Sequence, residues 1–220
     1  MSMEDMIPLL WQGLLETLQM TIPATAFSYL IGMPLGILLV VTRKDHIMPN
    51  PRLNAVLGTI VNFLRSIPFI ILLAMLFPVT RIVMGRAIGT SAIIFPLIIS
   101  AFPYVARMTE GALIEVDRGI IEAAQSMGST NSQIVFKVLI PEAMPSLING
   151  AAISMVNILG YTAMASAAGG GGLGSIAIIK GINIRKLDVM YAASILLVFL
   201  VQTITVTGTG VSKKIDHRKR

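Results

Sequence analysis

The sequence predicts an all-α integral membrane protein, organised as a single transmembrane domain over residues 1–220. Two features of the composition support this class: 55% of the residues are hydrophobic, and only 13% are charged. A soluble domain carries about 25% charged residues, so the chain is better suited to lipid than to water. The charged residues also gather in short segments, which leaves long uncharged runs between them.

These uncharged runs predict five transmembrane helices, because about 20 apolar residues are needed to cross a hydrocarbon core of about 30 Å. The expected spans are about 17–42, 54–78, 87–107, 146–168 and 189–211. The first run follows a short polar segment, as the core of a secretory signal does. That segment, MSMEDM, is acidic instead of basic, and the run exceeds the roughly 7 to 15 residues of a signal core. We therefore expect the first span to be retained.

An odd number of spans places the two termini on opposite sides of the membrane. With the N-terminus outside and the C-terminus in the cytoplasm, most of the 17 Lys and Arg residues fall on the cytoplasmic side, as the positive-inside rule requires. The basic tail, SKKIDHRKR, then faces anionic membrane lipid. We expect no nucleic-acid binding, because there is no folded basic domain. Cysteine is absent, which excludes disulfides and thiolate metal sites, and we expect no metal centre.

The longest polar connection, about 110–142, predicts two short helices on the cytoplasmic side. Each helix has one apolar stripe at helical spacing: Ile120, Ala124 and Met127 in the first, and Ile134, Val135 and Val138 in the second. Periodicity alone leaves two interpretations open. The segment is either a docking element for a partner or an amphipathic hairpin that lies on the membrane surface.

Local signals place the ends of these two helices. Gly128 occupies the position that ends a helix in a left-handed turn. Thr130 begins the second helix, because the stretch from Thr130 to Gln133 has the form of a capping box. We expect Pro141 to close the second helix, since proline removes a backbone donor and clashes with the preceding turn.

The same connection resembles the EAA loop of the permease subunits of ABC importers. The matching residues are Glu122-Ala123-Ala124, then Gly128 four residues on, then Ile140-Pro141. In that family the loop is a coupling helix that seats in a groove of a separate ATPase subunit. The resemblance implies the type I ABC importer permease fold and ATPase-coupling roles for Glu122, Ala123, Ala124, Gly128 and Pro141. Small side chains there would let a partner approach closely, and the acid would orient docking.

The resemblance also implies partners and a location. Two copies of the chain would form the pathway in a bacterial cell membrane, two ATPase subunits would bind ATP and Mg, and an extracytoplasmic substrate-binding protein would deliver the substrate. This chain would hold no cofactor and would catalyse no reaction of its own. The segments RSIPFIILL (65–73), GYTAM (160–164) and GGGGLG (169–174) resemble those of the methionine-uptake permeases. D- and/or L-methionine is therefore the expected substrate, and another small amino acid or a dipeptide is the alternative.

The glycine run satisfies the pattern G-x-G-x-x-G but is not a nucleotide site. It follows a membrane-length apolar run instead of a strand, and Ser175 stands where a P-loop requires lysine. We assign the run to close packing or gating at the outer end of the fourth span, with direct substrate contact as the alternative. The glycines concerned are Gly169, Gly170, Gly171, Gly172 and Gly174.

Four further residues are candidates for the translocation pathway. Arg65 is the charged side chain within an assigned span, so it should face the bundle interior, unless it merely snorkels to the interface. Pro68, one turn later, can kink that helix. Tyr161 and Met164 share a helix face, where an aromatic ring and a thioether could meet a methionine side chain. Core packing is the alternative role for this pair.

Two other classes of membrane protein fit the sequence less well. An ion-coupled secondary transporter or channel usually places Asp, Glu or His inside its spans, and the assigned spans contain none. An intramembrane enzyme such as a protease would need a Ser/His pair at bilayer depth. The only histidines, His46 and His217, fall in a loop and in the tail.

Overall fold

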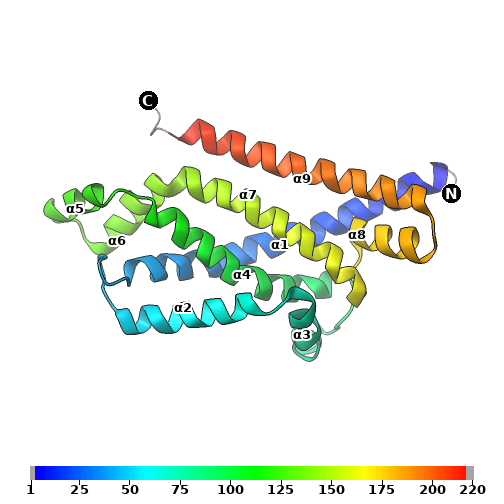
Figure 1. The fold of residues 1–220 in the computed structure, drawn as a ribbon, viewed down its shortest axis with the longest axis horizontal. Helices are drawn as coiled ribbons and strands as arrows, with labels where there is room; N and C mark the ends of the chain where they lie inside the picture. The colour runs from blue at the N-terminus through cyan, green and yellow to red at the C-terminus, as the bar shows by residue number, and fades with distance from the viewer. Residues whose placement is uncertain (1–2, 217–220) are drawn as a thin grey trace. The chain divides into compact units, whose positions relative to one another are not determined.

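The structure is a computed structural model that describes residues 3–216, so His217 and the end of the basic tail lie outside the described residues. Every regular element in this part of the chain is a helix, in agreement with the predicted all-α class (Figure 1). The elements are α1 Met3–Val41, α2 Pro51–Ser66, α3 Phe69–Met84, α4 Thr90–Ile114, α5 Arg118–Ser126, α6 Asn131–Ile134, η1 Val135–Leu139, α7 Ile140–Met164, η2 Ala165–Ala168, α8 Gly172–Ser175, η3 Ile176–Asn183 and α9 Leu187–Ile215.

Several of these helices are long and apolar enough to cross a membrane. Four candidates pass by length and composition, namely Glu4–Val41, Thr90–Ile114, Asn131–Met164 and Leu187–Ile215. A fifth span results if the bent pair α2 and α3 counts as one. The chain is therefore a multi-pass helical protein, while the number of spans and the orientation of the termini stay predictions.

The second predicted span, 54–78, is broken instead of kinked. Helix α2 ends at Ser66, and α3 begins at Phe69 with Pro68 as its N-cap residue. Proline disfavours helical geometry in the residue before it, here Ile67, and has no N–H to continue the ladder. The Pro68 carbonyl accepts backbone hydrogen bonds from Ile71 and Leu72 at 2.9 and 3.0 Å, so the same residue that ends one helix starts the next.

The expectation that Pro141 closes the second helix of the polar connection is wrong. The helix that begins at Asn131 continues to Met164, with Pro141 in the first turn of α7. A π-helical turn, η1, precedes it, and the Ile140 N–H bonds to the Val135 carbonyl, five residues back. Such a wide turn relieves the clash between a proline ring and the carbonyl of the preceding turn, which lets the helix pass through Pro141.

Contacts between residues divide the chain into two compact units, and α1, α4, α7 and α9 contribute residues to both. The first unit comprises 1–27, 67–101 and 154–205, and the second comprises 28–66, 102–153 and 206–220. The first unit has two hydrophobic clusters, one around Met20, Leu73, Ile93 and Leu97 and one around Leu10, Leu173 and Val189. The main cluster of the second unit includes Val41, Leu113, Ile121, Ile134 and Leu139.

Two glycines allow α1 to approach α4 closely in the second unit. A Cβ atom on Gly32 would lie 2.6 Å from the Phe102 carbonyl oxygen, and one on Gly36 would lie 2.5 Å from the Ala106 carbonyl oxygen. The spacing is that of the G-x-x-x-G motif, which brings membrane helices into backbone contact. This contact positions the end of α4, which leads into the polar connection that resembles the EAA loop.

Candidate functional site

The polar connection forms a helical hairpin with a defined corner. Helix α5 begins after Asp117, whose carboxylate accepts the Gly119 N–H at 2.6 Å, and it ends at a left-handed Gly128 with φ of +79°. The Gly128 N–H bonds to the Gln125 carbonyl at 2.9 Å, and the Ser129 N–H bonds to the Ala124 carbonyl at 3.1 Å. The predicted left-handed stop at Gly128 is confirmed.

The second arm of the hairpin starts with the predicted capping box. The Thr130 hydroxyl accepts the Gln133 N–H at 3.3 Å, and the Gln133 side chain accepts the Thr130 N–H at 2.8 Å. The predicted stripe of this arm also packs inward, since Ile134 and Val135 are buried and Val138 is half-buried against them. These contacts fix the direction in which the chain leaves the corner.

The apolar stripe predicted for α5 is in the wrong register. Ile121 and Ala124 are its buried residues, whereas Ile120 is 42% exposed and Met127 is 80% exposed. The short helix has apolar residues on two flanks, and tertiary packing selects the flank of Ile121, which joins the buried cluster of Leu113, Ile134 and Leu139. Ala124 therefore packs the helix against the core, and its small side chain is not on the outer surface.

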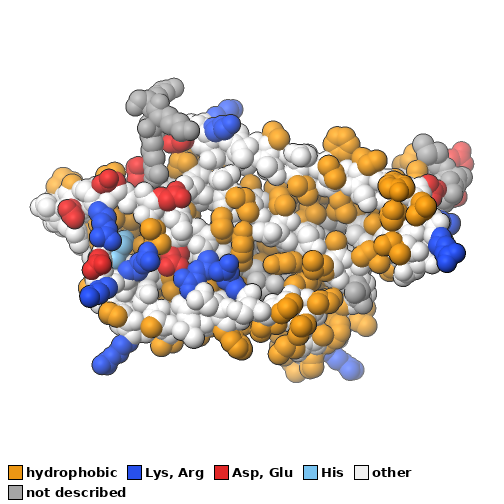
Figure 2. All heavy atoms as spheres, viewed as in Figure 1, with side chains coloured by type: hydrophobic (Ala, Val, Ile, Leu, Met, Phe, Trp, Pro, Cys, Tyr) orange, Lys and Arg blue, Asp and Glu red, His pale blue; other side chains and the backbone are white. Residues whose placement is uncertain are grey.

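The outward surface of α5 combines an acid with an apolar stripe. Glu122 and Ala123 are exposed. Ile120, Ala123 and Met127 are spaced i, i+3 and i+7, so they lie on one side of the helix; we refer to these three residues as the outer stripe. Figure 2 shows charged side chains gathered over this end of the second unit. An exposed apolar stripe rimmed by charge is typical of a docking surface.

The glycine run forms a sharp, tightly packed corner in the first unit. Gly169 and Gly172 have φ of +77° and +92°, which favours glycine. The Gly172 N–H donates to Glu16 Oε2 at 2.7 Å, and the Leu173 N–H donates to Thr17 Oγ1 at 2.9 Å. These two side chains of α1 thus satisfy backbone donors where the helix of α8 and η3 starts.

Close packing explains why glycine occupies several positions of this run. A Cβ atom on Gly171 would collide with the Glu16 carboxylate, and one on Gly174 would collide with Ala163. At Gly170 it would lie 2.8 Å from the Ala165 carbonyl oxygen. These contacts show that the glycines are closely packed. A gating role for the run stays a prediction.

Sequence reasoning missed Glu16. The predicted first span begins at Thr17, but α1 begins at Met3, and the candidate span Glu4–Val41 contains Glu16. The side chain is held by Gln12, whose Nε2 donates to Oε1 at 2.9 Å, as well as by Gly172. Glu16 is the only acid between Asp5 and Asp45, and this isolation inside a long apolar helix is the signal that could have identified it.

The pathway candidates lie in different surroundings. Tyr161 stacks on Phe69 with ring centroids 4.7 Å apart, as part of a buried cluster, whereas Met164 is 53% exposed. These contacts agree with the alternative role for Tyr161, which is core packing. The exposed Arg65 has its guanidinium 6.0 Å from the centroid of the Tyr104 ring, within range of a cation–π interaction.

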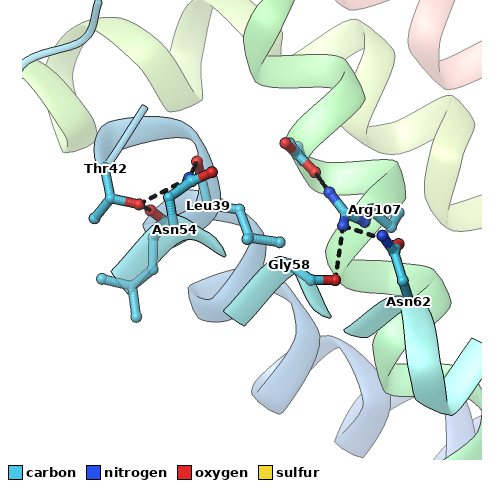
Figure 3. A network of polar contacts seen from close by, with 8 residues as sticks. Leu39, Thr42, Asn54, Gly58, Asn62 and Arg107 are labelled. Carbon is cyan, nitrogen blue, oxygen red and sulfur yellow. Dashed lines mark hydrogen bonds and ion pairs between the residues drawn. The ribbon is translucent and has the colours of Figure 1, made fainter. Parts of the chain in front are cut away.

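A polar network that the sequence did not predict ties α2 to its neighbours in the second unit (Figure 3). Arg107 of α4 donates to the Gly58 carbonyl at 3.1 Å and to Asn62 Oδ1 at 2.9 Å, and it pairs with Glu110. Asn54 donates to the Leu39 carbonyl at 2.6 Å and to Thr42 Oγ1 at 3.0 Å. Helix α2 is thus fastened to α1 at one point and to α4 at another.

The protein has several bilayer-length helices, and a polar hairpin between them exposes a surface that suits a partner. These are the features of a multi-pass membrane subunit of a transport complex. The chain belongs to the family of binding-protein-dependent transport system inner membrane components, whose model matches residues 32–220. This membership confirms the resemblance based on the EAA pattern, and it places the protein in the membrane.

Two relatives within this family are similar to the chain over most of its length. The chain is 47% identical over 217 residues to the probable D-methionine transport system permease protein MetI of Pasteurella multocida, covering 97% of this chain and 100% of the relative. It is 49% identical over 161 residues to the D-methionine transport system permease protein MetI of Escherichia coli K12, covering 73% and 74%.

Solved structures agree with the fold. A chain of the MetNI methionine ABC transporter, in an inward-facing conformation, matches with a TM-score of 0.96 and 45% identity over 99% of this chain and 100% of that one. A chain of an amino acid ABC transporter crystallised with histidines is 21% identical with a TM-score of 0.79, and it supports the fold alone. These matches confirm the predicted permease fold of the type I ABC importers.

Proposed function

We propose that this chain is the permease subunit of an ATP-driven importer of methionine, as the D-isomer, the L-isomer or both. Two copies would form the translocation pathway, and each would dock one ATPase subunit on α5. The proposal on substrate is supported by relatives named as D-methionine permeases that are 47% and 49% identical. Another small amino acid or a dipeptide is the alternative substrate.

The single observation that carries the coupling role is the surface of α5. Glu122 is exposed, and so is the outer stripe, in which Met127 is 80% exposed. A groove on an ATPase could bury the stripe, while a cation at its rim would pair with Glu122 and orient docking. Gly128 and the capping box hold this surface in one shape, so little order would have to be gained on binding.

The inner side of α5 supports a mechanical role. Ile121 and Ala124 pack in one buried cluster with Val40 of α1, Leu113 of α4 and Leu139 of η1. The link from α4 to α5 is only three residues long, and Val116 within it is 5% exposed. Because packed interiors transmit displacement, a shift of α5 would move the ends of these elements with it.

Alternating access follows from this arrangement. ATP and Mg, bound by the partner ATPase, would supply the free energy. Approach of the two ATPase subunits would draw the two copies of α5 together, and the attached helix ends would turn the pathway outward to receive substrate from the binding protein. Separation of the ATPase subunits would return α5 and the pathway to the inward-facing state.

Uptake of labelled methionine tests the proposal. Cells that lack their own methionine transporter would carry this chain with its ATPase and its binding protein, beside strains with Glu122→Arg and Glu122→Gln. We expect uptake with the native chain, an intermediate rate with Gln, and loss with Arg although the chain remains in the membrane. No uptake by an intact complex that hydrolyses ATP would reject methionine, and normal uptake with Glu122→Arg would reject coupling through this residue.

A further inference from the structure

A basic hollow lies in the second unit beside the start of α5. It has a volume of about 290 Å³, and its polar lining comprises Arg43, Lys44, Asp45, His46 and Arg118. Leu113, Ile114, Val116 and Ile121 form its apolar wall. We refer to this site as the basic hollow. Figure 2 shows basic, acidic and histidine side chains close together over this part of the unit.

The lining of the basic hollow carries more positive than negative charge. Within residues 3–216, Arg43, Lys44 and Arg118 form no ion pair, and Asp45 is the one carboxylate in the lining. Three cations against one anion leave an excess of positive charge at a concave site, where the charges reinforce one another. An anionic group in the hollow would relieve this repulsion.

His46 gives a second and independent sign of a missing ligand. Its Nδ1 atom is buried and has no hydrogen-bond partner. Burial, together with the positive charges of Arg118 and Arg43, lowers the pKa of His46 from its ordinary value. A buried polar atom without a partner is costly, and an acceptor oxygen placed in the hollow would satisfy it once Nδ1 carries a proton.

We propose that the basic hollow binds the phosphate group of an anionic phospholipid headgroup. Arginine side chains suit phosphate because the guanidinium fork donates two parallel hydrogen bonds, and lysine adds a compact charge. Arg43 and Arg118 would supply the forks, Lys44 the point charge, and His46 one further donor.

The position of the hollow favours a lipid over a soluble anion. Arg43 follows the end of candidate span α1 at Val41, and Ile114 is the last residue of candidate span α4. Span ends lie at the level of the headgroups, and basic pockets between membrane helices on the cytoplasmic side bind anionic headgroups. The apolar wall, with Ile114 47% exposed, suits the glycerol and first acyl carbons of a lipid.

A bound headgroup would also influence α5. Arg118 is the first residue of that helix, while Arg43 and Lys44 directly follow α1. The phosphate would therefore bridge the end of α1 to the start of α5. The binding site itself does not depend on the substrate that the complex transports.

The test uses the full chain in nanodiscs with an increasing fraction of phosphatidylglycerol in phosphatidylcholine. The protein contains no cysteine, so a single Ile114→Cys carrying an environment-sensitive fluorophore reports occupancy of the hollow. The variant Arg43→Gln/Arg118→Gln removes two lining charges. Arg52→Gln/Lys137→Gln is the matched control, because it removes the same charge from two exposed residues that do not line the hollow.

We expect a saturable response to phosphatidylglycerol that is at least about tenfold weaker in the hollow variant and little changed in the control. Equal responses in the two variants would overturn the proposal. Displacement of the lipid by inorganic phosphate would keep a phosphate site but reject a lipid as its occupant. If the hollow variant instead loses only its binding to the ATPase, the basic residues serve a protein contact and the lipid site is rejected. The single variant Lys44→Glu repeats the test should the double variant fold poorly.

Discussion

The carboxylate of Glu16 accepts a hydrogen bond of 2.7 Å from the backbone N–H of Gly172, 156 residues further along the chain. The next residue, Thr17, does the same for Leu173 at 2.9 Å. Two successive side chains of α1 thus cap the helix that follows the glycine run. Because the cap comes from a distant part of the chain, the corner at Gly169–Gly172 depends on α1 for its position.

Loss of the Glu16 carboxylate should loosen this corner. For Glu16→Ala we expect a loss of about 1–3 kcal/mol in the free energy of unfolding, since a buried N–H loses a charged acceptor. Glu16→Gln should lose less, because its amide oxygen can still accept the hydrogen bond. Thermal denaturation of the purified chain in detergent measures both variants, and equal midpoints for Glu16→Ala and the native chain would refute the role of the cap.

A side chain at Gly172 should be strongly destabilising. Its φ of +92° is strained for other residues, and a Cβ atom would lie 2.7 Å from Thr17 Oγ1. We expect Gly172→Ala to cost about 1–3 kcal/mol. Gly160→Ala is the control, because a Cβ there meets nothing within 4 Å and alanine favours the helix. If both variants melt at the same temperature, position 172 does not require glycine.

The ion pair of Arg107 and Glu110 should show coupling between its two partners. Their side chains are 24% and 11% exposed, so removing one partner leaves the other charge poorly solvated. We expect Arg107→Gln to lower the stability by about 2 kcal/mol and the added change Glu110→Gln to restore part of it. A double-mutant cycle by thermal denaturation checks this, and strictly additive effects would argue against a coupled pair.

His46 should make the stability depend on pH. Its pKa in the folded chain is lowered from the ordinary value of 6.5, with burial as the first cause. The unfolded chain therefore binds the proton more tightly, so the contribution of His46 is fully present above about pH 6.5 and is lost as the pH falls through the folded pKa. Arg43, Lys44 and Arg118 oppose protonation, and Asp45 and a bound phosphate favour it.

Denaturation at about pH 5.5 and about pH 8 compares the native chain with His46→Gln. We expect the native chain in phosphatidylcholine to lose more stability at the lower pH than the variant does. Phosphatidylglycerol should shrink that difference, since an anion in the basic hollow stabilises the imidazolium. The same pH dependence in the variant would assign the effect to other groups.

Two local signals in the polar connection predicted its structure correctly. Gly128 and the capping box of Thr130 and Gln133 depend only on neighbouring residues, and both are as expected. The register of α5 was missed because the choice between Ile120 and Ile121 is made by the core, not by the helix. Likewise, no local pattern reveals that Glu16 meets Gly172, since that contact joins two distant segments.

Pro68 and Pro141 also show that a local sequence signal alone does not determine the structure. Pro68 and Pro141 carry the same local signal, yet one ends a helix and the other lies inside one. The difference at Pro141 is the preceding π-helical turn, which is formed by Val135 and Leu139 as they pack into the core of the second unit. Proline chemistry alone therefore predicts a disturbance of the helix but not its outcome.

Cross-linking of α5 to the ATPase tests the central claim most directly. Met127→Cys would be the only cysteine in the chain, and Val206→Cys, at a residue that is 64% exposed in α9, is the control. In the assembled complex, we predict a cross-link from position 127 to the ATPase that changes in yield when ATP is bound, and none from position 206. Absence of a cross-link from position 127 in an intact complex, or equal yields at both positions, would contradict the account.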